Sequence, residues 1–349
     1  MRRNSLVLLF LFIAIVANAA RWNKETKDWS MNPHPTIGDW GFDRPGYPKG
    51  LYIHGITVKE GKRVKNPVIY DNDIYDDVFE DEWMYAMASL NKLKIAALII
   101  TPVLTDGWGF SHPEMIPTAH ESRDLAIKSG IPEKLLPPIT VGTLADSEKA
   151  GESKISEGAK LYVELINKHH KKHPNTPIIV NMGGQAATLA SAFCIDPSIA
   201  EKCIVYYTDV KVYNGHYEWA SKLVAKNFRV VSFGDKPWWV CKPTQHEWNV
   251  LPRPDEWYLL TEMNVPMLNH IVHQFRNRGE YIREGSCADG YHDGGFMHAW
   301  IPGMHKAAEL MEVRGEGTEA LHITAFTEAE ERLVKEQTMR TLLNPKCYR

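Results

Sequence analysis

Residues 68–81 read VIYDNDIYDDVFED, and this stretch decides the fold. Its β-branched and aromatic start, 68–70, predicts a strand, and six carboxylates follow within 71–81. In an open α/β sheet, ligands bind in the crevice outside the carboxyl ends of the strands. Carboxylates this close repel one another unless a cation lies among them, and their oxygens suit a hard divalent cation. The stretch therefore predicts a metal site that carries chemistry.

The rest of the sequence alternates between apolar runs typical of buried strands and amphipathic segments typical of helices. Strands are predicted at 68–70, 96–103, 139–141, 178–181, 204–207 and 229–233. Helices are predicted at 81–93, 118–128, 156–170, 186–193, 218–224, 257–275, 296–311 and 327–343. This alternation predicts the α/β class, with an open, mainly parallel, doubly wound sheet and helices on both faces.

The length and composition allow either one large α/β domain with additions or two ordinary domains. The chain has 349 residues and 44% apolar content, enough to bury a sizeable core. We expect a signal peptide at 1–19, an irregular N-terminal extension at 20–65, the α/β domain at 66–315 and a C-terminal helical tail at 316–349.

The first residues predict export. Arg2 and Arg3 precede an apolar stretch at 6–17, and residues 17–19 read Ala-Asn-Ala, a signal-peptidase pattern. An uncleaved anchor is the alternative, but the stretch is shorter than the roughly 20 residues that span a bilayer. We therefore expect cleavage after residue 19, no stable membrane anchor, and a secreted or periplasmic protein.

The charge balance argues against a polyanionic partner. The net charge is −3 and the pI is about 6.6, so the sequence lacks the basic excess of proteins that bind nucleic acid or anionic membranes. We expect a small-molecule partner and no nucleic acid.

The five cysteines show no metal-binding spacing. They are Cys194, Cys203, Cys241, Cys287 and Cys347, with no C-x-x-C pair among them. In an oxidising compartment Cys194 and Cys203 are the first candidates for a disulfide, and plain burial is the alternative.

The Asp71-x-Asp73 pair has a competing interpretation. It also suits haloacid-dehalogenase phosphatases, in which the first aspartate is the nucleophile and the second the acid/base. That motif expects threonine two residues after the second aspartate, where this sequence has Tyr75, so the fit is poor.

Six landmarks follow one another along residues 66–310. They are Asp71-x-Asp73 with the pair Glu80-Asp81, the strand at 98–106 that ends in Asp106, the short strand at 139–142, the strand and loop at 178–190, Tyr213-Asn214-Gly215 before the helix at 218–224, and His292-Asp293 before the helix that starts at Phe296. In their order and placement they resemble the inosine/uridine-preferring nucleoside hydrolase family.

The resemblance implies a calcium-dependent hydrolase that splits the N-glycosidic bond of ribonucleosides into ribose and free base. It assigns metal binding to Asp73, Asp81, Asp293 and, through a backbone carbonyl, Gln185. It assigns substrate binding to Glu80, Asp106 and Asn214, and catalysis to Asp73 and His292. Asp73 would act as general base towards a water held by the metal, and His292 would protonate the leaving base. It also implies a homo-oligomer.

Departures from the family pattern leave alternatives open. Val212 stands where many members carry a sugar-binding glutamate, and Asp106 replaces an asparagine. Because the acidic loop is long, Asp76-Asp77 rivals Glu80-Asp81 as the functional pair. The alternative functions are a catalytically impaired, metal-containing protein that binds a nucleoside or sugar, and a hydrolase of another glycoside.

Overall fold

The computed structural model describes most of the predicted α/β domain. The described residues are 56–59, 62–65, 67–73, 80–102, 112–144, 155–174, 177–183, 185–208, 218–233, 255–277, 308–313, 318–323 and 328–348. The predicted signal peptide lies outside them.

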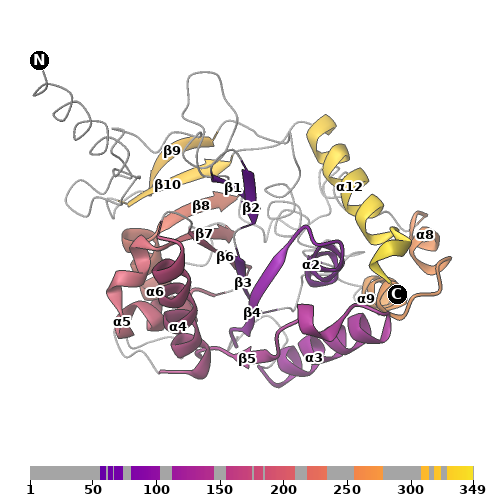
Figure 1. The fold of residues 1–349 in the computed structure, drawn as a ribbon, viewed down its shortest axis with the longest axis horizontal. Coiled ribbons are helices and arrows are strands. Elements are labelled where there is room, and N and C mark those ends of the chain that lie inside the picture. Colours follow the sequence, from indigo (N-terminus) through magenta and orange to yellow (C-terminus); the bar gives the residue numbers. More distant parts are fainter. Residues whose placement is uncertain are drawn as a thin grey trace, which may run out of the picture.

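The centre of the fold is an eight-stranded sheet with the order β5-β4-β3-β6-β7-β8-β10-β9 (Figure 1). Its strands are β3 (Pro67–Asn72), β4 (Lys94–Ile100), β5 (Ile139–Val141), β6 (Ile178–Met182), β7 (Cys203–Thr208), β8 (Arg229–Phe233), β9 (Ala308–Val313) and β10 (Thr318–Ile323). Neighbouring strands run parallel except β9, which is antiparallel to β10. A separate hairpin pairs β1 (Ile56–Lys59) with β2 (Lys62–Lys65).

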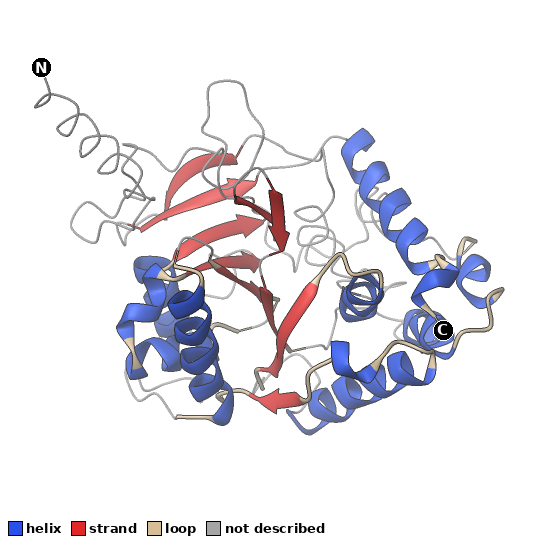
Figure 2. Ribbon diagram, in the orientation of Figure 1, coloured by secondary structure: helices blue, strands red, loops and turns tan. Residues whose placement is uncertain are grey.

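Helices lie on both sides of this sheet (Figure 2). The described helices are α2 (Glu80–Ser89), α3 (His112–Lys128), α4 (Glu157–Lys172), α5 (Ala187–Ile195), α6 (Glu218–Asn227), α8 (Trp257–Thr261), α9 (Pro266–Asn277) and α12 (Glu328–Leu342). Helices α4, α5 and α6 pack together on one side, whereas α2, α3, α9 and α12 lie on the other. None of the described helices has both the length and the apolar character that a membrane span requires.

The central strands are covered on both faces. All six residues of β3 and all five of β6 are buried, as expected for parallel strands between two helical layers. This double burial explains why these strands read as nearly continuous apolar runs rather than as an alternating pattern. The predicted fold class is confirmed.

The direction of winding reverses between β3 and β6. From β3 the chain moves outward through β4 to β5, and it then returns to β6 and moves the other way through β7 to β8. Asp71 pairs with Met182, so the two strands end side by side, and the backbone N–H of Gly183 donates to the carbonyl of Asp71 at 3.0 Å. Such a switch point is where open α/β sheets bind ligands.

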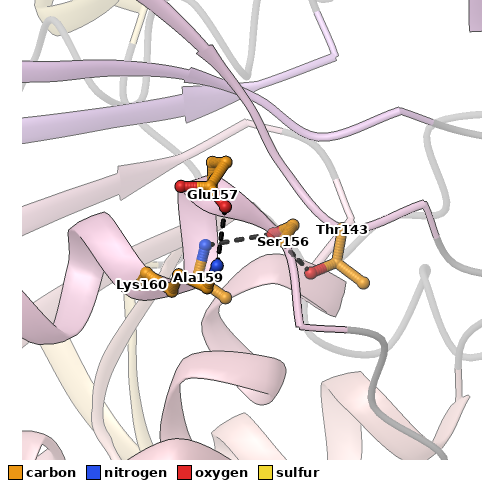
Figure 3. A network of polar contacts seen from close by, with 5 residues as sticks. All are labelled: Thr143, Ser156, Glu157, Ala159 and Lys160. Carbon is orange, nitrogen blue, oxygen red and sulfur yellow. Dashed lines mark hydrogen bonds and ion pairs between the residues drawn. The ribbon is translucent and has the colours of Figure 1, made fainter.

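Polar contacts fix the start of α4 next to the end of β5 (Figure 3). The Ser156 hydroxyl accepts from the backbone N–H of Ala159 at 3.0 Å and lies 2.8 Å from the Thr143 hydroxyl. Lys160 and Glu157 form an ion pair at 2.7 Å on the exposed surface of the first turn. The cap satisfies a backbone donor that the helix itself cannot pair.

The carboxyl of Asp71 ties β3 to the neighbouring elements. It is fully buried and accepts hydrogen bonds from the hydroxyls of Thr101, just after β4, and Tyr162, on α4, the latter at 2.7 Å. The Thr101 hydroxyl also lies 2.5 Å from that of Thr188 on α5. Burial raises the pKa of Asp71 to about 7, and the hydrogen bonds from Thr101 and Tyr162 oppose this rise.

Two predicted helices are wrong in part. The predicted helix at 257–275 is split into α8 and α9, because Asn264 adopts a left-handed φ of 50° and Pro266 begins α9. Residues 308–311, predicted as the end of a helix, belong to β9 and pair with β10. Cross-strand pairing decided the conformation of this segment.

The predicted disulfide between Cys194 and Cys203 is wrong. Both thiols are free: Cys194 is exposed at the end of α5, whereas Cys203 is buried and contacts the carbonyl of Ile199 at 3.5 Å. Plain burial, the alternative, describes Cys203.

Strands also occupy segments expected to be irregular or helical. The hairpin β1–β2 lies within the extension predicted as irregular, and β10 lies within the predicted helical tail. Because β10 pairs with β8 and β9, the sheet continues beyond residue 315.

We predict that Tyr162→Phe destabilises the protein more at pH 8 than at pH 5. The folded-state pKa of Asp71 lies above its ordinary 3.8, so the folded protein holds an extra proton and stability falls as the pH rises towards 7. A hydrogen-bond donor stabilises an ionised carboxylate more than a protonated one. We therefore expect Tyr162→Phe to lower the free energy of unfolding by about 2 kcal/mol at pH 8 and by about 1 kcal/mol at pH 5. Urea unfolding in buffer with chelator measures both.

The control for this prediction is Tyr348→Phe. The Tyr348 hydroxyl donates to the backbone carbonyl of Leu342 at 2.6 Å, an acceptor that does not titrate, so its loss should cost the same at both pH values. A pH-independent cost for Tyr162→Phe would contradict the assignment.

Candidate functional site

The candidate site lies at the carboxyl ends of β3 and β6, where the winding reverses. Four predicted site residues fall among the described ones: Asp73, Glu80, Asp81 and Gln185. The other four, Asp106, Asn214, His292 and Asp293, lie outside the described residues, as do Asp76 and Asp77.

Glu80 begins α2 and is held by two amides from the central strands. Its side chain is buried, with Oε1 accepting from Asn181 Nδ2 at 2.5 Å and Oε2 accepting from Asn72 Nδ2 at 3.4 Å. Asn72 ends β3 and Asn181 lies in β6, so adjacent strands supply the two donors. A carboxylate is also favourable at a helix N-terminus. The position of Glu80 is therefore fixed from three sides.

A glycine makes room for this arrangement. A Cβ atom on Gly183 would lie 2.7 Å from Asn72 Nδ2, so any larger residue there would collide with the amide. Asn72 Nδ2 also lies 2.6 Å from the Tyr70 hydroxyl, which further fixes the amide. Gly183, which directly follows β6, therefore leaves the space that the contact between Asn72 and Glu80 needs.

Asp73 follows β3 directly and is partly exposed. Its backbone N–H donates to Asn72 Oδ1 at 2.7 Å. Among these four residues, Asp73 alone is not buried. A general base has to reach its substrate, and Asp73 meets that requirement.

Asp81 and Glu82 form a buried acidic pair that shares one hydroxyl. Ser122 on α3 donates to Asp81 Oδ2, and its Oγ lies 3.1 Å from Glu82 Oε1. Burial, and then the negative charge of Asp81, raise the pKa of Glu82 well above its usual range. The Oε2 atom of Glu82 has no hydrogen-bond partner.

Gln185 places an unused oxygen just after β6. The residue is 8% exposed, and its buried Oε1 has no hydrogen-bond partner. A buried amide oxygen normally accepts a hydrogen bond or coordinates an ion. The family resemblance implies a backbone carbonyl of this loop as the metal ligand, and the orphaned side-chain Oε1 is a further oxygen donor at Gln185.

The donors at this edge are oxygen atoms, which fits a hard cation such as calcium. Within the described ranges, however, no three His, Cys, Asp or Glu side chains cluster closely enough to hold a metal ion. The fit therefore rests on the chemistry of the donors and on the Gln185 oxygen.

Asp71 does not suit the role of a phosphatase nucleophile. It is 0% exposed, and both of its carboxyl oxygens accept hydrogen bonds from the fold. This burial removes the main support for the phosphatase interpretation.

Sequence reasoning missed Asn72, Asn181 and Ser122. Asn181 is the one polar residue in the buried strand β6, which reads IIVNM. Ser122 shares the buried face of α3 with Ala119 and Ala126. A polar residue on an otherwise apolar buried face was the available signal, because such a residue needs a partner.

No protein-family model and no curated protein sequence matches the chain. A plant nucleoside hydrolase structure superposes with a TM-score of 0.51 at 13% identity, covering 81% of this chain and 99% of that one. The type III effector protein XopQ, solved with adenosine diphosphate ribose, superposes with a TM-score of 0.51 at 10% identity, covering 80% of this chain and 94% of XopQ. A nucleoside hydrolase-related protein from Saccharophagus degradans superposes with a TM-score of 0.48 at 13% identity, covering 82% of this chain and 72% of that one. The chain therefore has the fold of solved nucleoside hydrolases, as its motifs predicted.

Proposed function

We propose that the protein is a calcium-dependent hydrolase that splits the N-glycosidic bond of ribonucleosides into ribose and free base. The observation that carries the proposal is that Asn72, at the end of β3, contacts both the backbone N–H of Asp73 and the carboxylate of Glu80 at the switch point. Asp73 is partly exposed, whereas Glu80 is buried and held by two amides. A mobile base would misplace the water, and a mobile carboxylate would misplace the sugar.

In this proposal Asp73 accepts a proton from the attacking water as the bond to the base breaks. Glu80 accepts hydrogen bonds from ribose hydroxyls, since each carboxylate oxygen offers more lone pairs than its amide contact uses. The negative charge of both residues stabilises the oxocarbenium-like sugar of the transition state. The resemblance adds Asp106 and Asn214 as ribose contacts and His292 as the acid that protonates the base.

Asp73, Asp81, Gln185 and Asp293 would hold the calcium ion. When bound, the ion would orient the attacking water and polarise it. Gln185 would give its backbone carbonyl, and its orphaned Oε1 offers a second oxygen at the same residue.

The substrate in this proposal is a small molecule. The plant structure is named as a nucleoside hydrolase, and XopQ was solved with adenosine diphosphate ribose. The compounds named with these two proteins of the same fold both contain ribose. The apolar start of the chain supports export of the enzyme. Homo-oligomerisation stays a proposal from the resemblance.

One observation favours a second candidate, a calcium-containing protein that binds a nucleoside or sugar without turnover. Glu80 is 1% exposed and already paired with two amides, so its carboxylate is satisfied without a substrate. Both candidates bind calcium, and only the hydrolase releases reducing sugar.

We predict calcium-dependent release of reducing sugar from one or more members of a panel of purine and pyrimidine ribonucleosides. Asp73→Asn removes the base and should lower kcat by about 10²–10⁴-fold. Asp124→Asn, an exposed carboxylate on α3, serves as the control and should leave kcat unchanged. Calcium binding without sugar release from any panel member would contradict hydrolysis and favour the binding protein.

We also predict that Asn181→Leu lowers kcat/KM by about tenfold or more, because Glu80 loses a hydrogen bond to a charged group. Calcium affinity should change little. Asn167→Leu breaks a similar amide contact, 2.7 Å to Asp196, away from the switch point and should leave kcat/KM unaltered. Equal effects of the two substitutions on kcat/KM would refute a role for Asn181 in holding Glu80.

A further inference from the structure

We infer that Asn72, at the end of β3, is a positioning residue whose single amide holds the base Asp73 and the sugar-binding carboxylate of Glu80 in a fixed relation to each other. The inference rests on the proposed function, since it takes the roles of Asp73 and Glu80 from it. Asn72 is 0% exposed, so it acts through these two neighbours and not on the substrate itself.

The two ends of the Asn72 amide face different partners. Its Oδ1 accepts from the backbone N–H of Asp73 at 2.7 Å, whereas its Nδ2 lies 2.6 Å from the Tyr70 hydroxyl and 3.4 Å from Glu80 Oε2. An asparagine amide has two N–H donors, and these contacts use both. Turning the amide over would set Nδ2 against another donor and Oδ1 against a carboxylate. The contacts therefore select one orientation of the amide.

Gly183 is the surface on which this amide rests. The three atoms nearest to a Cβ built on Gly183 are Nδ2, Cγ and Oδ1 of Asn72, at 2.7, 2.9 and 2.9 Å. All three belong to one amide, so a methyl group on residue 183 would push the whole amide out of its place. The φ of Gly183 lies outside the left-handed region, so alanine there brings no backbone strain of its own. Gly183→Ala therefore displaces the amide without removing it.

The relation between the two carboxylates matters because both act at the same anomeric carbon. Asp73 directs the attacking water and Glu80 holds the ribose, so an error in their relative position becomes an error in the line of attack. A misplacement of about 1 Å can lower the rate by about 10²-fold. Asn181, by contrast, reaches Glu80 from β6. Losing Asn72 therefore disturbs the base as well as the sugar contact.

The test is the steady-state kinetics of the full-length protein with the ribonucleoside that the wild type hydrolyses fastest. We expect kcat to fall by about 10²-fold in Asn72→Ala and by about tenfold or more in Gly183→Ala. The double variant should be no slower than Asn72→Ala, because no amide remains for the new methyl group to displace. Thermal unfolding checks that each variant is folded, and Gly183→Ala keeps the test open even where Asn72→Ala does not fold.

Two further variants separate positioning from a merely structural role. Asn181→Leu loosens Glu80 alone, so its loss should lie mainly in KM, whereas Asn72→Ala should also lower kcat. Asn227→Leu removes a 2.7 Å amide contact to the carbonyl of Leu223 at the end of α6 and should keep the wild-type kcat.

The outcomes also separate this inference from the proposed function. Additive losses of kcat in the double variant, or a kcat in Gly183→Ala equal to that of Asn227→Leu, would overturn the role of Asn72 alone. A wild-type protein that releases no sugar from any ribonucleoside would overturn the proposed function and the inference together.

Discussion

The parallel pairing of β3 with β6 is the constraint on which the rest of the site depends. It joins segments that are far apart in sequence and sets Tyr70 opposite Asn181 and Asp71 opposite Met182. Both strands therefore end at the same edge, where Asp73 directly follows β3 and Gly183 directly follows β6. A slip of one residue would turn the side chains of a strand to the opposite face and separate Asn181 from Glu80.

Neutral donors hold the acidic side chains in place. Asp71 accepts from Thr101 and Tyr162, Glu80 accepts from two amides, and Asp81 accepts from Ser122. Hydroxyls and amides fix the direction of a carboxylate without cancelling its charge. An ionised group in such a setting still attracts a cation, and this is the property that the proposed calcium-dependent function requires of the site.

Much of the fold followed from local sequence. The strands at 139–141 and 229–233 were predicted with the observed bounds, because short apolar runs between turns are a clear signal. The segment at 308–311 was predicted as helix and is strand, since pairing with β10 decides its conformation. That pairing is not visible in the segment itself.

In the candidate site, too, some features follow from local sequence and others from long-range packing. The placement of Asp73 and Glu80 followed from the strand end and the helix start that surround them. The contact of Asn181 with Glu80 depends on the packing of α2 against β6, and the contact of Ser122 with Asp81 depends on the packing of α2 against α3. Long-range packing of this kind leaves only a weak trace in sequence, a polar residue on a buried face.

The most direct test of the central claim is a crystal structure of the protein grown with calcium, with the ion located by its anomalous scattering. The account predicts calcium at the switch point between β3 and β6, with oxygen atoms of Asp73, Asp81 and Gln185 at about 2.3–2.6 Å. Calcium bound elsewhere, or an ion that these residues do not contact, would contradict it.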